Sequence, residues 1–372
     1  MKKLLILLAL AMLVLAGCVS DRSITAAVTA DDEIKIGASL FLTGSDISFI
    51  ADAMREGIVL ATDELNANGG ILGKQIKIIY EDDQFNLVKA TTVAQKLIEV
   101  DDVSAGLVGV WNTAKATSTV FETNERPLIV LWDANEEIEK VGNHVFSIGF
   151  QTEAAGREMA EFLIKQNVKT AAIVYHEDDW SQLISLSFEK RFKDLGGQIT
   201  IKESAAIDET DFRSIILKAK GADSLYAPVA ANWDKFFKQV YEVGFDGIVT
   251  TGDGFTEDVI NIIPRESEGV YTTQLFVQDA LQYKLLAEKY KQKYNKEPEL
   301  LIFTALGYDG VMVLAEAIKI AGSDDPKKIS KAMYKVQNFE GAAGIVSINE
   351  KGSSNKLERI FQVRNGKMVL IQ

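Results

Sequence analysis

Along most of this chain, short apolar runs alternate with longer stretches in which apolar residues recur every three or four positions. The first unit has an apolar run over 34–37, a polar loop over 43–46 and helical spacing over 51–68. Glycines at 69–70 end this helix, and 75–81 returns as a strand. The unit has no glycine-rich phosphate-binding motif, so we predict a strand–helix–strand arrangement that can hold a small ligand without a nucleotide.

The same alternation then continues in two series, each of which predicts strands separated by helices. The first series predicts strands over 105–110, 128–132 and 144–148. The second predicts strands over 170–175, 198–203, 224–228 and 247–251. Strands that alternate with helices are typical of parallel, doubly wound sheets, so we predict an α/β protein with two Rossmann-like lobes. The C-terminal part is mixed, with predicted helices over 281–294, 307–321 and 325–336, and strands over 344–348, 359–364 and 368–371.

The N-terminus has the pattern of an export signal. A basic start is followed by an apolar stretch over 4–15, which is too short to span a bilayer. We therefore predict a signal peptide over 1–17. The sequence LAGC at 15–18 resembles a lipoprotein signal-peptidase box, and Cys18 is the only cysteine of the chain. This resemblance implies a lipidated Cys18 and a polar tether over 18–33, whereas the alternative is an ordinary signal peptide with a buried cysteine.

Composition restricts the function further. The formal net charge is −13 at pH 7, which disfavours binding to nucleic acid or to an anionic membrane surface. After the signal, about 340 residues remain, which is typical of two domains. With Cys18 lipidated, no disulfide can form in the body. No Gly-x-Ser-x-Gly motif and no His or Cys cluster is present, so we expect neither an enzyme, a metal nor a cofactor.

The first unit also carries a family pattern. The sequence LTG follows the first strand, ELNANGGILGK ends the helix, and DD follows the second strand. This pattern resembles periplasmic solute-binding proteins of the branched-chain amino acid type, from about residue 34 to 372. The resemblance implies the type I periplasmic binding protein fold, with two lobes joined by three crossovers near Phe150, 276–279 and 338–341. Lobe 1 is then expected over 34–150 plus 279–338, and lobe 2 over 151–278 plus 339–372.

The candidate ligand contacts lie just past predicted strand ends, where open α/β sheets bind their ligands. The chain has only four tryptophans, and each follows a predicted strand end. They are Trp111, Trp132, Trp180 and Trp233. Packing alone is a weak explanation for four such positions, although Trp233 also fits the apolar face of its helix. We therefore predict that at least two tryptophans line the ligand site.

The family resemblance implies further contacts. Asp253 matches an acidic position that faces the ligand's ammonium group, with a helix cap as the alternative. Trp180 and Phe49 match aromatic positions, and Phe303 matches an apolar contact that could equally be core. The full set of predicted ligand contacts is Phe49, Trp111, Asn112, Thr113, Trp132, Asp133, Asn135, Trp180, Ala230, Asp253 and Phe303.

Two of these positions depart from the amino-acid-binding members. Asp133 stands where those members have small neutral residues, and Ala230 or a neighbour replaces an aromatic. A carboxylate 4 Å from a ligand carboxylate would cost about 4 kcal/mol at an effective dielectric of 20. We therefore expect a small polar or cationic solute, held by aromatic faces and carboxylates, with a sugar or polyol as the alternative. Asp133 could also be an exposed cap that points away from the ligand.

The expected function is that of a monomeric, non-enzymatic receptor that closes its two lobes on a solute and delivers it to an ABC-type permease. We expect it on the outer face of the cytoplasmic membrane or in the periplasm, anchored through Cys18. A sensory receptor of the same fold is the alternative. A hydrolase is poorly supported, because the only histidines are His144 and His176 and neither has recognisable partners.

Overall fold

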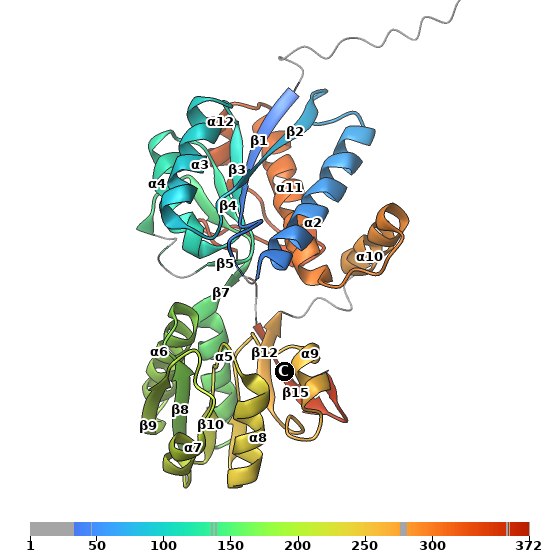
Figure 1. Ribbon diagram of the computed structural model, residues 1–372. Coiled ribbons are helices and arrows are strands. Elements are labelled where there is room, and N and C mark those ends of the chain that lie inside the picture. The colour runs from blue at the N-terminus through green and yellow to red at the C-terminus, as the bar shows by residue number, and fades with distance from the viewer. Residues whose placement is uncertain are drawn as a thin grey trace, which may run out of the picture. The chain divides into compact units, whose positions relative to one another are not determined.

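The computed structural model describes residues 33–45, 47–134, 137, 140–275, 281–354, 356 and 358–371. Residues 34–372 make up one compact unit. It contains two large sheets, each covered by its own helices (Figure 1). The predicted α/β fold with parallel sheets is therefore confirmed. Cys18, the predicted signal peptide and all of the predicted tether except Glu33 lie outside the described residues.

The first sheet has five strands in the order β2-β1-β3-β4-β6. Its pairs β1–β3, β3–β4 and β4–β6 are parallel. Every residue of β3 and β4 is buried, as expected for parallel strands with helices on both faces. The strands are β1 (Glu33–Leu40), β2 (Gln75–Asp82), β3 (Ala105–Val108), β4 (Leu128–Val130) and β6 (Val145–Ser147).

Six helices pack with this sheet. They are α2 (Ser48–Ala67), α3 (Leu87–Glu99), α4 (Trp111–Thr123), α10 (Leu281–Tyr294), α11 (Leu301–Ala321) and α12 (Pro326–Met333). Helices α2 and α11 cross closely because glycines lie at their contact. A Cβ on Gly57 would lie 1.9 Å from the carbonyl oxygen of Thr304, and one on Gly307 would lie 2.0 Å from that of Met54. Among the described helices, α11 alone is long and apolar enough to span a membrane, but it is mostly buried in this core.

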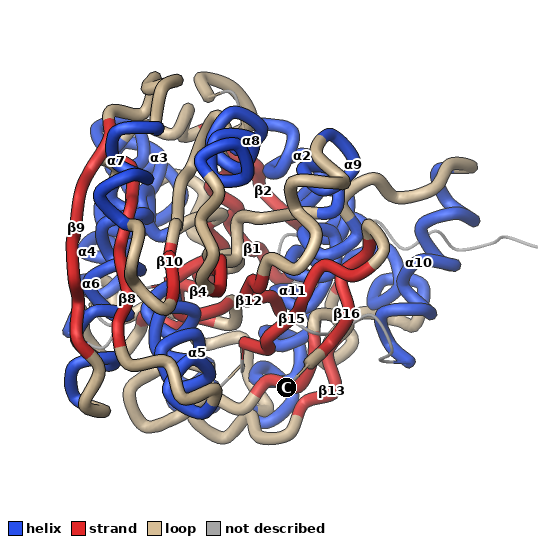
Figure 2. Tube along the Cα trace, turned by 90° about the horizontal axis from the view of Figure 1, so that it is seen from below, coloured by secondary structure: helices blue, strands red, loops and turns tan. Residues whose placement is uncertain are grey.

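The second sheet has seven strands in the order β16-β15-β12-β11-β10-β8-β9. Strands β9, β8 and β10 run side by side (Figure 2), and the pairs from β9 to β12 are parallel. The pairs β12–β15 and β15–β16 are antiparallel, and Asn365 and Gly366 form the turn of the last hairpin. The strands are β8 (Thr170–His176), β9 (Gln198–Ala205), β10 (Ser224–Tyr226), β11 (Ile248–Thr250), β12 (Tyr271–Leu275), β15 (Glu358–Arg364) and β16 (Lys367–Leu370).

The helices of the second sheet divide its apolar residues into two core clusters. Helices α5 and α6 contribute residues such as Phe162 and Phe188 to one cluster. Helices α7 and α8 contribute Ile216 and Phe237 to the other. The bounds are α5 (Thr152–Lys165), α6 (Asp179–Asp194), α7 (Arg213–Ala219), α8 (Trp233–Val243) and α9 (Glu257–Ile262).

The third crossover lies later in the chain than the predicted 338–341. Strands β13 (Phe339–Gly341) and β14 (Gly344–Val346) form a separate hairpin that packs with the helices of the first sheet. The buried carboxylate of Asp309 on α11 accepts hydrogen bonds from the N–H groups of Ala342 at 2.7 Å and Ala343 at 2.8 Å. Ser354 still contacts the first sheet, because its N–H donates to the carbonyl of Ser147. The chain therefore reaches the second sheet only between Ser354 and Glu358.

Candidate functional site

Asp133 caps the beginning of α4 from a neighbouring loop. It follows β4 in the short strand β5 (Asp133–Ala134), which pairs with β7 (Phe150–Gln151). Its Oδ1 accepts a hydrogen bond of 3.1 Å from the backbone N–H of Trp111, the first residue of α4. A carboxylate is favourable there because a helix N-terminus has unpaired N–H groups and a partial positive charge. Asp133 therefore caps α4, which agrees with the alternative interpretation given above. Its side chain is partly buried, however, whereas that interpretation expected it to be exposed.

Four aromatic rings gather beside this cap. Trp132 and Phe303 meet edge to face with ring centroids 5.0 Å apart. Phe41, the first residue after β1, lies 6.4 Å from Trp132 and 5.5 Å from Phe85. Phe41 is buried, whereas the other three rings are partly exposed. The carboxyl-terminal edge of the first sheet therefore offers aromatic surface next to a carboxylate.

The corresponding edge of the second sheet combines an indole with another carboxylate. The Trp180 Nε1–H donates to Oδ1 of Asp253 at 3.2 Å. Asp253 lies between two glycines that leave room for indole rings. A Cβ on Gly252 would lie 3.1 Å from Trp180, and one on Gly254 would lie 3.3 Å from Trp233. This edge thus presents Asp253 flanked by two tryptophans.

The two carboxylates interact with one another. Burial raises the pKa of Asp133 to about 6, against the lowering effect of its bond to the α4 N–H. Burial raises the pKa of Asp253 to about 7, and the negative charge of Asp133 contributes to this rise. Glu358 adds a third acid, because burial and the charge of Asp253 raise its pKa well above the usual range. Neither carboxyl oxygen of Glu358 has a hydrogen-bond partner among the described residues. The site therefore gathers carboxyl groups whose ionised forms are destabilised by burial and by one another, and a ligand cation would stabilise those ionised forms.

A family model for periplasmic binding proteins matches residues 33–367, which is nearly all of the described chain. The chain belongs to this family. Its two mainly parallel sheets, with acidic and aromatic residues at strand ends, agree with a fold that binds solutes beyond its strands.

Several relatives of this periplasmic binding protein are named as amino-acid-binding proteins. It is 27% identical to a leucine-, isoleucine-, valine-, threonine- and alanine-binding protein of Pseudomonas aeruginosa, over 87% of each chain. It is 29% identical to the solved leucine-binding protein LivK of Thermotoga maritima, with a TM-score of 0.77 and coverage of 91% and 98%. It is 26% identical to the branched-chain amino acid transporter substrate-binding protein LivJ of Streptococcus pneumoniae, solved with isoleucine (TM-score 0.76, coverage 91% and 99%). These relatives are binding proteins, which confirms the prediction that the chain is not an enzyme.

Five of the predicted contacts lie at these two strand edges of the periplasmic binding protein. Trp132 contacts Phe303, Asp133 directly follows Trp132, and Trp180 bonds to Asp253. Asp253 is not the helix cap that its alternative interpretation held, because the N-cap residue of α9 is Thr256, three positions later. The carboxylate is therefore available to the site.

Several other predicted contacts have their side chains elsewhere. Trp111 is only 5% exposed and packs in a core cluster with residues of α3, so it does not fit the prediction of a ligand contact. Thr113 is buried, and its hydroxyl donates to the carbonyl of Val110 at 3.4 Å. These residues do lie just past a strand end, but they form the first turn of α4, where helical geometry turns their side chains toward the core.

The remaining predicted positions contribute less. Asn112 is partly buried in the same turn, Ala230 is exposed, and Phe49 is 56% exposed in the first turn of α2. Asn135 lies outside the described residues. Phe41, Phe85 and Glu358 were not predicted. Phe41 could have been predicted from the sequence, because it directly follows the first strand. Glu358 could not, because it comes near Asp253 only through the late third crossover.

His176 positions a loop instead of acting as a base. Its Nδ1 accepts hydrogen bonds from the N–H groups of Ala230 at 3.0 Å and Ala231 at 3.3 Å. An acceptor nitrogen requires a neutral ring, and burial lowers the pKa of His176 accordingly. Within the described residues, no three His, Cys, Asp or Glu side chains are arranged to hold a metal ion.

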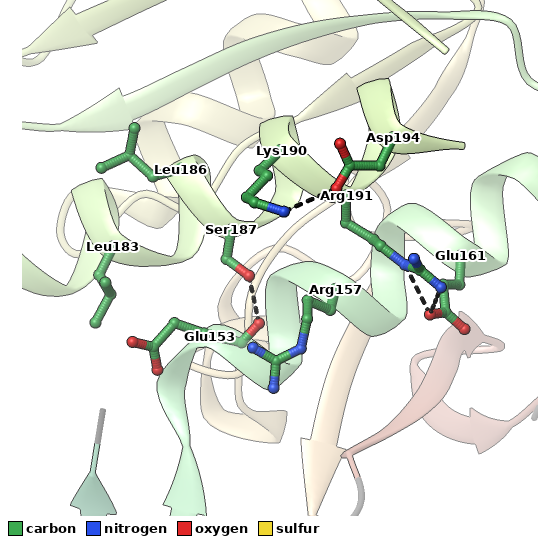
Figure 3. A pocket seen from close by; sticks show the side chains of 9 residues that line it. All are labelled: Glu153, Arg157, Glu161, Leu183, Leu186, Ser187, Lys190, Arg191 and Asp194. Atoms are coloured by element: carbon green, nitrogen blue, oxygen red, sulfur yellow. Dashed lines mark hydrogen bonds and ion pairs between the residues drawn. The ribbon is translucent and has the colours of Figure 1, made fainter. Parts of the chain in front are cut away.

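A cavity lies away from these strand ends, lined by residues of α5 and α6 (Figure 3). It has a volume of about 550 Å³. Its charged groups pair with one another, for example Arg191 with Glu161 at 2.6 Å and Lys190 with Asp194 at 2.8 Å. Ser187 donates its hydroxyl to the carbonyl of Glu153 at 2.6 Å. Because these charged and hydroxyl groups already have partners, this surface groove offers a solute few free ionic or hydrogen-bonding contacts.

Proposed function

We propose that this periplasmic binding protein captures a small polar solute between its two lobes and delivers it to an ABC-type permease. The single observation that carries the proposal is that each sheet places a carboxylate beside an indole at its strand ends, Asp133 next to Trp132 in the first and Asp253 bonded to Trp180 in the second. A ligand that contacts both would hold the lobes together. Closure would then be a population shift whose size depends on the ligand's preference for the closed state.

The names of the relatives support this proposal. They bind amino acids, and the Streptococcus pneumoniae protein is a transporter substrate-binding protein. For this chain we propose the first lobe over 34–150 plus 281–354 and the second over 151–275 plus 358–371. The division follows the partners of each segment, including the bonds of Asp309 to Ala342 and Ala343.

We further propose that the exported protein is a monomer anchored to the membrane through lipids on Cys18. The support is the LAGC sequence directly after the apolar signal stretch. Metabolic labelling with an alkyne-bearing fatty acid should label the wild-type protein and not a Cys18→Ser variant. Equal labelling of both proteins would contradict the anchor without affecting the solute-binding proposal.

A thermal-shift screen of the purified protein tests solute capture. The panel should contain amino acids, amines, sugars and nucleosides. A solute at 100 times its dissociation constant adds about 2.7 kcal/mol to the free energy of unfolding, which is a readily measured shift. Small-angle scattering should then show a smaller radius of gyration with the solute. A bound solute that leaves the radius unchanged would contradict closure.

A further inference from the structure

We propose that the solute of this site is an organic cation with an ammonium group and no carboxylate, such as an alkylamine, a diamine or a quaternary amine. The inference rests on the proposed function, because it concerns which solute the same site accepts. It departs from the amino acids that the named relatives bind. Three features of the site carry it: an occupied helix N-terminus, an excess of acids, and aromatic faces from both sheets.

The N-terminus of α4 is already occupied by a carboxylate of the protein. Helix N-termini attract anions, and α4 begins at the edge of the sheet where a solute would bind. Asp133 takes the first N–H of this helix at 3.1 Å and is part of the chain itself. A solute carboxylate would have to displace Asp133 or lie beside it, and both arrangements are unfavourable.

The charges around the two aspartates favour a cation. Asp253 from the loop after β11 has Asp133 and Glu358 as acidic neighbours, and its own charge acts on the buried Tyr226 of β10. Lys115 acts on Asp133, but Lys115 is exposed on the surface of α4. Burial leaves these acids poorly solvated, so a ligand ammonium would gain by pairing with them.

Aromatic faces supply the second part of a cation site. Trp132 and Phe303 are partly exposed on the first lobe, and Trp180 and Trp233 are partly exposed on the second. The bond from Trp180 Nε1 to Asp253 fixes the orientation of that indole. Indole faces attract ammonium groups most strongly where water is excluded. An aromatic and acidic enclosure thus suits the charge and the alkyl part of an amine.

Calorimetric titration with matched pairs of compounds at pH 8 tests the proposal. The pairs are 3-methylbutylamine with leucine, and choline with glycine betaine. Each pair has the same or a closely similar alkyl or ammonium part, and only one member carries a carboxylate. We expect at least one amine to bind, and its carboxylated partner to bind at least about 100-fold more weakly. A carboxylated compound that binds as tightly as its partner would overturn the proposal.

An Asp133→Asn variant identifies the residue responsible. Asparagine keeps an oxygen that can accept the N–H of Trp111, so the cap of α4 is retained while the charge is lost. We expect the amine to bind about 10-fold or more weakly and the preference over the carboxylated partner to shrink. Asp179→Asn is the matched control, because Asp179 is an exposed acid beside Trp180. An unchanged preference in Asp133→Asn would contradict the proposal.

The outcomes also separate this inference from the proposed function. If a sugar or an amino acid binds and no amine does, solute capture stands and the cation inference is wrong. If no compound of the thermal-shift panel binds to a folded protein, both are contradicted. Circular dichroism of each variant establishes that a loss of binding is not a loss of folding.

Discussion

An Asp253→Asn variant should be more stable than the wild-type protein at pH 8 while it binds solute more weakly. Burial and Asp133 raise the pKa of Asp253 to about 7 in the folded protein. An unfolded aspartate has a pKa of about 3.9, so the folded state keeps its proton to a higher pH. The free energy of unfolding therefore falls as the pH rises from about 4 to about 7, and the penalty is complete above that range.

The size of this effect follows from the two pKa values. The full difference corresponds to about 4 kcal/mol, and the partial exposure of Asp253 reduces it through solvent screening. We expect Asn at this position to recover about 1–2 kcal/mol at pH 8 and much less at pH 4.5. Asparagine still offers an oxygen to the Trp180 indole, so that contact is not lost.

Urea unfolding at pH 4.5 and pH 8 measures the effect. The control is Asp223→Asn in the same lobe, because hydrogen bonds from the N–H groups of Thr170 and Lys169 lower the pKa of Asp223. That substitution should destabilise the protein at pH 8, which is the opposite sign. The reasoning is refuted if Asp253→Asn lowers the unfolding midpoint at pH 8, or if its effect is the same at both pH values.

Three further predictions concern packing, a hydrogen bond and fluorescence. Gly307→Ala should lower the free energy of unfolding by at least about 2 kcal/mol, because the new Cβ would lie 2.0 Å from a backbone oxygen of α2. The control Lys319→Ala, on the same helix, should change the free energy of unfolding by less than about 0.5 kcal/mol. His176→Ala should lower the free energy of unfolding, measured with urea, by about 1–3 kcal/mol, because two backbone N–H groups lose their acceptor. A variant as stable as the wild-type protein would contradict this role of His176. Trp132→Phe should reduce the change in tryptophan fluorescence on solute binding, whereas Trp111→Phe should preserve it, because Trp111 is 5% exposed in the core.

The order of strands and helices could be predicted because each element carries its own local pattern. The apolar run of β3 and the helical spacing of α2 are readable without any distant partner. The third crossover was placed too early for the opposite reason. The strand-like pattern of residues 339–346 fits either lobe. Their contacts with the first sheet's helices, including the bonds to Asp309 about 30 positions earlier, place them beside that sheet.

Part of the candidate site could be predicted, because strand ends are recognisable in the sequence. The rest could not, because the sequence does not show the direction in which each side chain points. Trp132 and Trp180 both follow strands and both lie in the site, but Trp111 follows a strand and turns into the core as the first residue of α4. Asp133 was recognised as unusual because the amino-acid-binding members that the chain resembles have small neutral residues at that position. That it occupies the N–H of Trp111 depends on the pairing of β5 with β7, which no local pattern indicates.

A calorimetric double-mutant cycle addresses the shared role of Asp133 and Asp253 most directly. The affinity of the solute found in the screen is measured for the wild-type protein, Asp133→Asn, Asp253→Asn and the double variant at pH 8. If one solute lies between both carboxylates, each single variant should bind about 10-fold or more weakly, and the double variant should lose less than the sum of the two. A single variant that binds as tightly as the wild-type protein would show that the solute does not contact both lobes through these residues.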